Sequence, residues 1–142
     1  MVPKYLKKGY KIFVLDEATF CILPKVARAW FLKGSRPIQK FAYVRAHFHC
    51  YGAQGSEKTH YMFGDKLNSK QFLRFLKKLK KKYLRIFIVL DNAKWHKTKK
   101  VLGYCKQTKI KVEFLPPYSP QLSSIEPWWK QLKHTTANKF LR

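Results

Sequence analysis

Acidic residues are scarce in this sequence of 142 residues. Seven Asp and Glu stand against 31 Lys and Arg, so the formal net charge is +24. A protein with so large a positive charge attracts polyanions, of which nucleic acid is the commonest. The charge indicates the kind of partner only, because a ribosome-associated protein and a nucleic-acid enzyme would be equally basic.

Cysteines and long apolar runs are also few. The three cysteines, Cys21, Cys50 and Cys105, are far apart and form no C-x-x-C pair, which predicts reduced thiols rather than a disulfide framework. No stretch approaches the roughly 20 apolar residues that a membrane helix needs, and no apolar secretory segment follows the basic start. We therefore expect a cytoplasmic protein that has no membrane partner.

The apolar composition predicts a folded chain. Hydrophobic residues make up 46% and aromatic residues 16% of the sequence, whereas a disordered basic tail would be poor in large apolar side chains. The length suits one domain, and no internal repeat, long linker or low-complexity tract divides it. We expect a single domain over residues 1–142.

Two short apolar runs predict buried strands, residues 11–15 (KIFVL) and residues 85–90 (RIFIVL). Continuous apolar runs of this length are typical of strands that are buried on both faces of a sheet. We expect the first strand to stop at Asp16 and the second to stop at Asp91. Residues 41–51, which mix aromatic and small side chains, indicate one or two further strands.

Apolar residues at helical spacing predict a helix over residues 68–84, with Asn68 and Gln71 in a capping arrangement. The other face of this helix carries a row of lysines, which either is solvated or faces DNA. A second helix is expected over about residues 97–108, and a strand over residues 110–115 follows it.

A last helix is expected to start near Ser123 or Ser124. Strands and helices thus alternate after residue 68, which is the signature of an α/β sheet with crossover helices. The first third of the chain indicates strands alone, so we expect a central mixed β-sheet flanked by helices.

Three of the seven acids stand at predicted element boundaries. Asp16 and Asp91 follow the two buried strands, and Glu126 falls in the first turn of the last helix. In an α/β sheet the carboxyl ends of strands and the N-termini of helices converge on one rim, where sites are usually built. Carboxylates gathered there repel one another unless cations neutralise them. Mg²⁺ takes such oxygen ligands, and two ions about 3.5–4 Å apart promote phosphodiester cleavage or transfer.

Each of these acids also has a purely structural interpretation. Asp16 could begin a turn, Asp91 with Asn92 could cap the following helix, and Glu126 with Ser123 could form a capping box. The interpretation as a site therefore depends on all three acids lying on one rim of the same sheet.

Four segments, in order, carry a resemblance to a known family. They are residues 14–17 (VLDE), residues 30–37 (WFLKGSRP), residues 89–93 (VLDNA) with His96, and residues 115–120 (LPPYSP) continuing through Glu126 to Lys133. Together they resemble the catalytic domain of a DDE transposase of the mariner superfamily, in its bacterial and archaeal insertion-sequence branch. The 34 residues between Asp91 and Glu126 match the family's spacing. One departure is visible, because Ser123 and Ser124 stand where the family usually has Asn-Pro.

The resemblance implies a ribonuclease-H-like fold and two Mg²⁺ or Mn²⁺ ions held by the catalytic residues Asp16, Asp91 and Glu126. It implies nicking of double-stranded DNA at transposon ends, followed by attack of a free 3′-hydroxyl on target DNA. It also implies a homodimer, associated with the nucleoid when it is bound to DNA. Family members usually carry N-terminal helix-turn-helix modules, and we expect these modules to be absent here, since Asp16 comes almost immediately.

Several further residues are candidates for auxiliary roles. Glu17 would point to the opposite face of a strand from Asp16 but could approach the metals where the strand ends. Asn92 lies beside Asp91, and His96 could contact a substrate phosphate or orient the loop. The residues that we expect to contact DNA are Lys33, Arg36, Lys94, Lys97, Tyr118, Lys130 and Lys133.

Two other functions remain open at this point. One is a non-catalytic, basic nucleic-acid-binding remnant of a transposase, which the net charge also fits and which would bind DNA without metal-dependent chemistry. The other is a related ribonuclease-H-like nuclease, such as a junction resolvase, which would differ in the nucleic acid that it cleaves.

Overall fold

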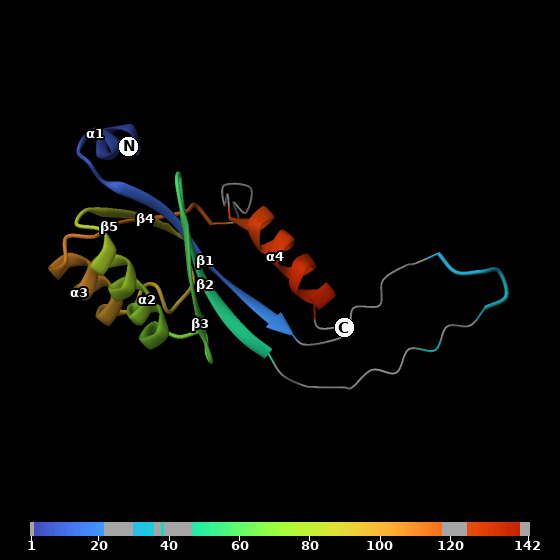
Figure 1. The fold of residues 1–142 in the computed structure, drawn as a ribbon. Helices are drawn as coiled ribbons and strands as arrows, with labels where there is room; N and C mark the ends of the chain where they lie inside the picture. Colours follow the sequence, from blue (N-terminus) through green and yellow to red (C-terminus); the bar gives the residue numbers. More distant parts are fainter. Residues whose placement is uncertain (1, 22–29, 36–37, 39–46, 118–124, 140–142) are drawn as a thin grey trace.

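A five-stranded mixed sheet forms the centre of the molecule (Figure 1). The structure is a computed structural model that describes residues 2–21, 30–35, 38, 47–117 and 125–139. Its elements, in chain order, are α1 (Val2–Lys7), β1 (Lys11–Cys21), β2 (His47–Gly55), β3 (Thr59–Gly64), α2 (Ser69–Lys82), β4 (Ile86–Leu90), α3 (Lys99–Gln107), β5 (Lys111–Phe114) and α4 (Glu126–Lys139).

The strand order in the sheet is β3-β2-β1-β4-β5. The first three strands pair in antiparallel fashion. Residues 56–58 join β2 to β3, whereas residues 22–46 separate β1 from β2. β4 pairs in parallel with β1, and β5 pairs in parallel with β4. α2 and α3 lie in the connections that lead to β4 and β5, so they act as crossover helices. The mixed α/β sheet predicted from the sequence is confirmed.

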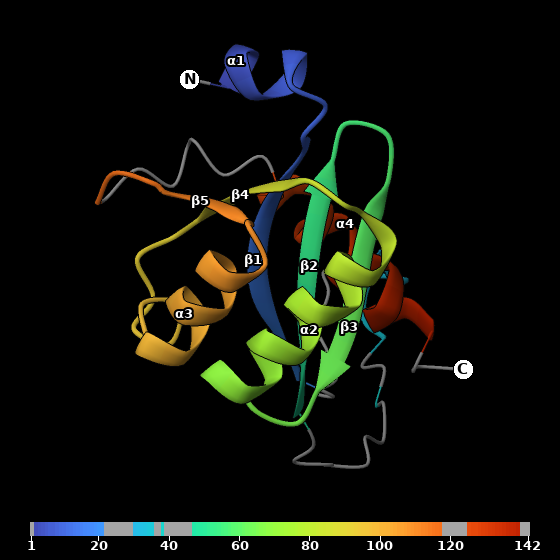
Figure 2. The ribbon, with the colours of Figure 1, turned by 90° about the vertical axis from the view of Figure 1, so that its left-hand side faces the viewer.

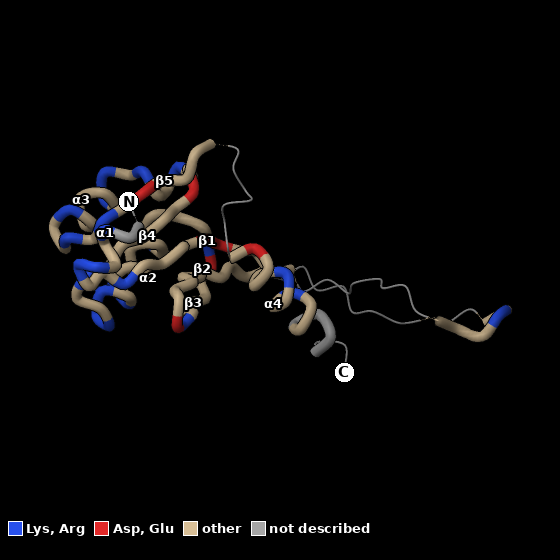
Figure 3. The backbone as a smooth tube through the Cα atoms, turned by 90° about the horizontal axis from the view of Figure 1, so that it is seen from above, with Lys and Arg blue, Asp and Glu red and all other residues tan. Residues whose placement is uncertain are grey.

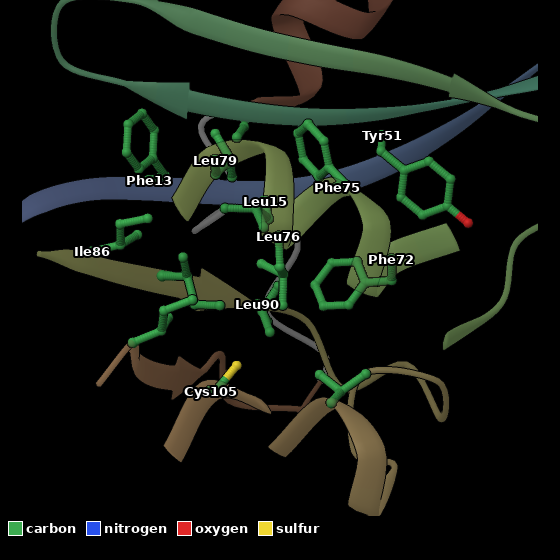
Figure 4. Close-up of a cluster of buried hydrophobic side chains, with 14 residues drawn as sticks. Phe13, Leu15, Tyr51, Phe72, Phe75, Leu76, Leu79, Ile86, Leu90 and Cys105 are labelled. Atoms are coloured by element: carbon green, nitrogen blue, oxygen red, sulfur yellow. The ribbon is translucent and has the colours of Figure 1, made fainter. Parts of the chain in front are cut away.

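The helices cover both faces of the sheet. α2 and α3 lie against one face and α4 lies against the other (Figures 1 and 2). The larger apolar core fills the space between the sheet and the α2–α3 layer (Figure 4) and includes Phe13, Leu15, Phe75, Leu79 and Ile88. A smaller cluster lies under α4 and consists of Ala18, Phe20, Cys50, Ile125 and Trp129.

The sequence pattern of α2 explains its position. Its apolar residues recur at helical spacing and are buried, whereas its lysines are mostly exposed. The Asn68 side chain accepts a hydrogen bond from the backbone N–H of Gln71 at 2.9 Å, so the predicted N-cap is confirmed. The Oε1 atom of Gln71 has no hydrogen-bond partner, so the reciprocal half of a capping box is not formed.

The main difference from the sequence-based expectation is the length of β1. This strand does not stop at Asp16 but runs on to Cys21, because β2 pairs with it along this whole stretch. The parallel pairing with β4 ends earlier, at Val14 and Val89. Asp16 therefore lies inside β1 and next to the point where its neighbour β4 ends.

Smaller differences concern short elements. The helix α1 and the edge strand β3 were not predicted, because neither has a long apolar run. α4 begins at Glu126, while Ser123 and Ser124 lie outside the described residues. A strand was predicted within residues 41–51. Residues 47–51 of this region form the first part of β2, which begins at His47. None of the helices in the described part of the chain is long and apolar enough to cross a membrane.

Candidate functional site

Asp16 and Asp91 come together because two neighbouring parallel strands place them at the same level. Val14 of β1 is paired with Val89 of β4, and each Asp lies two residues beyond its valine. Asp91 directly follows the last residue of β4, at the carboxyl edge where α/β sheets commonly carry sites. The charge of Asp91 contributes to raising the pKa of Asp16, so the two carboxylates interact.

The Asp16 carboxylate is held at both oxygens. Its Oδ1 accepts a hydrogen bond from the backbone N–H of Glu17 at 2.8 Å, and its Oδ2 accepts one from the indole N–H of Trp129 at 3.0 Å. Burial raises the pKa of Asp16, these two hydrogen bonds lower it, and the charges of Glu17 and Asp91 raise it again, with a net upward shift. A cation placed beside this carboxylate would relieve the repulsion.

Trp129 reaches Asp16 because β2 has a glycine at the position opposite it. Gly52 is the register partner of Asp16. A Cβ atom at Gly52 would lie 2.7 Å from two ring carbons of Trp129 and 3.1 Å from Ile125 Cδ1. The glycine thus lets α4 approach the sheet closely enough for the indole N–H to bond Asp16.

Glu17 lies on the other face of β1 and is paired with His96. The side chains of both are almost fully buried, with exposed fractions of 4% for Glu17 and 0% for His96, and the Nε2 atom of His96 lies 2.8 Å from Glu17 Oε1. The indole N–H of Trp95 donates to the same oxygen at 3.4 Å. The sequence-based expectation that Glu17 points away from Asp16 agrees with these contacts.

The second ring nitrogen of His96 faces Asp91. Nδ1 lies 2.8 Å from Asp91 Oδ1, in an ion-pair contact that falls short of an aligned hydrogen bond. Burial alone would lower the pKa of His96, but the contacts with Asp91 and Glu17 outweigh it and raise the pKa to about 9. His96 is therefore an imidazolium at neutral pH, with one carboxylate on each nitrogen.

The side chain of Asp91 is more exposed to solvent than those of His96 and Glu17. Its side chain is 54% exposed, and its Oδ1 also accepts a hydrogen bond from the backbone N–H of Ala93 at 3.1 Å. The contact with His96 holds the pKa of Asp91 below its usual value, although burial opposes this shift. Both contacts engage Oδ1, which keeps the carboxylate ionised and fixes one of its oxygens.

Asn92 has a structural role in the described geometry. Its side-chain amide donates to the backbone carbonyl of Leu115 at 2.6 Å, and the backbone N–H of Leu115 donates to Leu90 at 2.7 Å. These bonds fasten the segment after β5 to the end of β4. They fix the point where the chain turns into Pro116 and Pro117.

Glu126 does not join the two aspartates directly. It is exposed and is the first residue of α4, one helical turn before Trp129. Among the residues that the structure describes, no hydrogen bond or ion pair links Glu126 to Asp16 or Asp91, and no three His, Cys, Asp or Glu side chains are grouped closely enough to hold a metal ion. The role of Glu126 as a third ligand stays a prediction.

The predicted DNA contacts are spread over the molecule. Lys94 and Lys97 are exposed in the segment after Asp91, and Lys130 and Lys133 are exposed on α4. Lys33 lies in the exposed segment 30–35, which extends away from the sheet (Figure 1). The other two predicted contacts, Arg36 and Tyr118, lie outside the described residues.

Sequence reasoning missed two residues that shape the site. Trp129 is buried in the cluster under α4, and its indole N–H also donates a hydrogen bond to Asp16. Gly52 lies inside β2 and accommodates that indole. The signal for Trp129 was its position three residues after Glu126, which places both on one side of a helix.

The chemistry of the two aspartates is that of ligands to a hard divalent cation. Asp16 and Asp91 offer carboxylate oxygens, which are the ligands that Mg²⁺ and Mn²⁺ prefer. A third carboxylate is that of Glu126, which begins α4, the helix that carries Trp129. The carboxylates are oriented by hydrogen bonds to Trp129, Glu17 and Ala93. Many Lys and Arg residues lie over α2 and α3, and others lie on α4 (Figure 3), so a polyanion would be drawn toward the molecule.

One curated protein is similar to this chain in sequence. A curated relative, the "Insertion element IS630 uncharacterized 39 kDa protein" of Shigella sonnei, is 28% identical over 132 residues, which are 89% of this chain and 38% of the relative. This chain therefore spans less than half of that relative's length.

Solved structures show the same fold. The "Mos1 transposase paired-end complex with left transposon end" matches 94% of this chain and 45% of its own, with 18% identity and a TM-score of 0.69. The "Mos1 mariner paired end complex with Mn" matches the same shares with 19% identity and a TM-score of 0.67. The expected ribonuclease-H-like fold is confirmed by this likeness.

The family follows from the sequence itself. The family described as "DDE superfamily endonuclease" matches residues 11–142, which is nearly the whole chain and includes all three predicted acids. The relative from an insertion element and the mariner structures agree with the resemblance seen in the four sequence segments. This chain belongs to the DDE superfamily endonucleases.

Proposed function

We propose that this chain is the catalytic domain of a transposase, which uses divalent metal ions to cleave DNA and to join a free 3′-hydroxyl to target DNA. The observation that carries the proposal is the pair of carboxylates, Asp16 and Asp91, at one level of two parallel strands. Family membership supports it, as does the likeness to a mariner transposase solved with transposon ends.

The metal ions would be held by Asp16, Asp91 and Glu126. When bound, two Mg²⁺ or Mn²⁺ ions would activate a water molecule or a 3′-hydroxyl and stabilise the leaving oxygen. The donor set fits, because burial and, to a smaller extent, the charges of Glu17 and Asp91 raise the pKa of Asp16, and a bound cation would favour the charged carboxylate again. One of the mariner structures was solved with Mn, which supports the choice of ion.

The chain's own residues would prepare the site for this chemistry. Trp129 and the backbone of Glu17 hold the Asp16 carboxylate, while His96 and the backbone of Ala93 hold that of Asp91. Because these contacts are made before metal or DNA arrives, little reorganisation is needed when they bind.

Double-stranded DNA, as transposon ends and target, is the proposed partner. Lys94 and Lys97 lie next to Asp91 in the chain, and Lys130 and Lys133 lie on the helix that begins with Glu126. These exposed lysines flank the acids from two sides and would bind phosphates on either side of the scissile bond. We also propose that the protein acts as a homodimer, since two transposon ends must be brought together.

The test is a nicking assay with supercoiled plasmid in Mn²⁺ or Mg²⁺. We expect the wild-type chain to nick DNA only with metal, and Asp16→Asn, Asp91→Asn and Glu126→Gln each to abolish nicking while retaining DNA binding. Wild-type DNA binding without any metal-dependent nicking would favour the non-catalytic binding protein. Preferred cleavage of four-way junctions or RNA–DNA hybrids over duplex DNA would favour the related nuclease.

A further inference from the structure

We propose that His96, anchored by the buried carboxylate of Glu17, is the positioning residue for Asp91. The inference rests on the proposed function, in which Asp91 binds a metal ion. In this arrangement neither Glu17 nor His96 touches metal or DNA, and their role is to fix the orientation of the Asp91 side chain.

The burial of Glu17 excludes it as a ligand in the described geometry. Its side chain is only 4% exposed. Its Oε1 atom already accepts hydrogen bonds from the ring nitrogens of His96 and Trp95. It lies on the face of β1 opposite to Asp16, next to its register partner Tyr51. The Glu17 carboxylate also acts on Tyr51: burial raises the pKa of the phenol, and the charge of Glu17 raises it further.

The His96 ring is enclosed by the same core. Its ring centre lies 4.4 Å from that of Phe72 on α2, and Phe72 lies beside Tyr51 (Figure 4). The ring has no exposed surface, so it cannot reach a DNA phosphate. This leaves the interpretation in which His96 orients the loop, and discards the one in which it contacts substrate.

A buried ion pair is seldom retained for stability alone. Desolvation of two charges often cancels their attraction, so apolar residues of similar size would serve a core as well. The pair here has a further contact that an apolar core would lack, because Nδ1 of the same ring faces Asp91 Oδ1 at 2.8 Å. The contact of Glu17 with Nε2 fixes the orientation of the His96 ring, and this places Nδ1 against Asp91.

The loop between Asp91 and His96 is closed by local bonds of its own. The backbone N–H of Ala93 donates to Asp91 Oδ1, and the backbone N–H of His96 donates to the carbonyl of Ala93 at 3.1 Å. The loop therefore holds the backbone, and the His96 ring adds the contact from the core side. Groups that orient a metal ligand in this way typically change metal affinity about 10–100-fold when they are removed.

A simpler explanation is that His96 only contributes charge. The two explanations predict opposite signs for His96→Gln, which removes a cation beside the carboxylates. Charge alone predicts tighter Mn²⁺ binding, whereas loss of positioning predicts weaker binding. The double variant Glu17→Gln/His96→Gln separates the two explanations more clearly. It removes one charge of each sign, so the net charge is unchanged, and neither member of the buried pair is left as an unpaired charge.

The experiment measures Mn²⁺ affinity by electron paramagnetic resonance of the free ion, in the full chain without DNA. We expect the double variant to bind Mn²⁺ about 10–100-fold more weakly than the wild type. His96→Asn should retain more affinity than His96→Gln, because the asparagine amide can replace Nδ1 toward Asp91, whereas the glutamine amide can replace only Nε2 toward Glu17.

Leu79→Ala is the matched control for a general loss of stability. Leu79 is buried in the same core, about two turns along α2 from Phe72, and its truncation should lower the melting temperature without changing Mn²⁺ affinity. Wild-type affinity in the double variant, or tighter binding in His96→Gln, would overturn the positioning role. Absence of Mn²⁺ binding in the wild type would instead refute the proposed function, so the two failures are distinguishable.

Discussion

The substitution Gly52→Ala tests how α4 is docked on the sheet. The added methyl group would lie 2.7 Å from Trp129 Cη2 and Cζ2 and 3.1 Å from Ile125 Cδ1, distances that are too short for carbon atoms. Trp129 has a rigid, buried ring that contacts Phe20 and Trp128. Moving this ring away from the new methyl group would therefore disrupt its packing. Overpacking of this kind costs about 1–3 kcal/mol.

A second cost arises if the ring moves. The indole N–H donates to Asp16 Oδ2 at 3.0 Å, and a hydrogen bond to a charged group contributes about 1.5–3 kcal/mol. Partial loss of this bond brings the expected total to about 2–4 kcal/mol. With an unfolding entropy of about 2.1 cal/mol/K per residue, this corresponds to a fall in melting temperature of roughly 7–13 °C.

Urea denaturation followed by circular dichroism gives the change in the free energy of unfolding, and a double-mutant cycle with Trp129→Leu assigns its cause. Leucine at position 129 removes the ring carbons that the new methyl group would meet. We therefore expect Gly52→Ala to cost at least about 1 kcal/mol less in the Trp129→Leu background than in the wild type.

Gly103→Ala is the matched control. Gly103 lies inside α3, and a Cβ atom there would meet nothing within 4 Å. Alanine is the better helix former by about 1 kcal/mol, so this variant should be unchanged or more stable. The reasoning about Trp129 is refuted if Gly52→Ala costs less than about 0.5 kcal/mol, or if its cost is the same in both backgrounds.

Three further predictions concern charge and burial. Asp16→Asn should abolish any rise in melting temperature that Mn²⁺ causes in the wild type, because it removes a charged carboxylate from the proposed metal site; an undiminished rise would contradict this. His96 has its pKa raised to about 9, so its contribution to stability is complete below pH about 6.5 and is lost as the pH rises through 9. Urea titrations between pH 6 and 10 should show this decline, and a flat profile would count against it. Cys21 is exposed, whereas Cys50 and Cys105 are buried with pKa values raised to about 11, so a thiol reagent should modify one cysteine in the folded protein and three in urea, as counted by mass spectrometry.

The parts of the fold that the sequence predicted are those determined by local pattern. α2 was predicted from its apolar spacing and from Asn68 at its start, and β4 from its continuous apolar run. The end of β1 was wrong because a local pattern cannot show that β2 continues to pair beyond Leu15. Strand length here is determined by partner residues that are 26 to 36 positions away in the chain.

The same distinction applies to the site. The two aspartates were predicted because each follows an apolar run that marks a strand. Their partners were not, since Trp129 is 113 positions from Asp16 and His96 is 79 positions from Glu17. Nothing in the local sequence around Gly52 indicated that an indole ring would pack on its Cα. The sequence can therefore indicate which acids belong to the site. Their orientation depends on contacts between segments that are distant in the chain, which a local pattern does not show.

One strand links the two helical layers to the two aspartates. Asp16 and Glu17 are consecutive in β1, so they point to opposite faces of the sheet. Asp16 is bonded to Trp129 of α4 on one face, and Glu17 reaches Asp91 through His96, which packs on Phe72 of α2 on the other. A shift of α4 therefore acts first on Asp16, and a shift of α2 acts first on Asp91. β1 is paired on both sides up to Val14, and its pairing with β2 continues through Asp16 and Glu17. This pairing holds the backbone of both acids against such shifts.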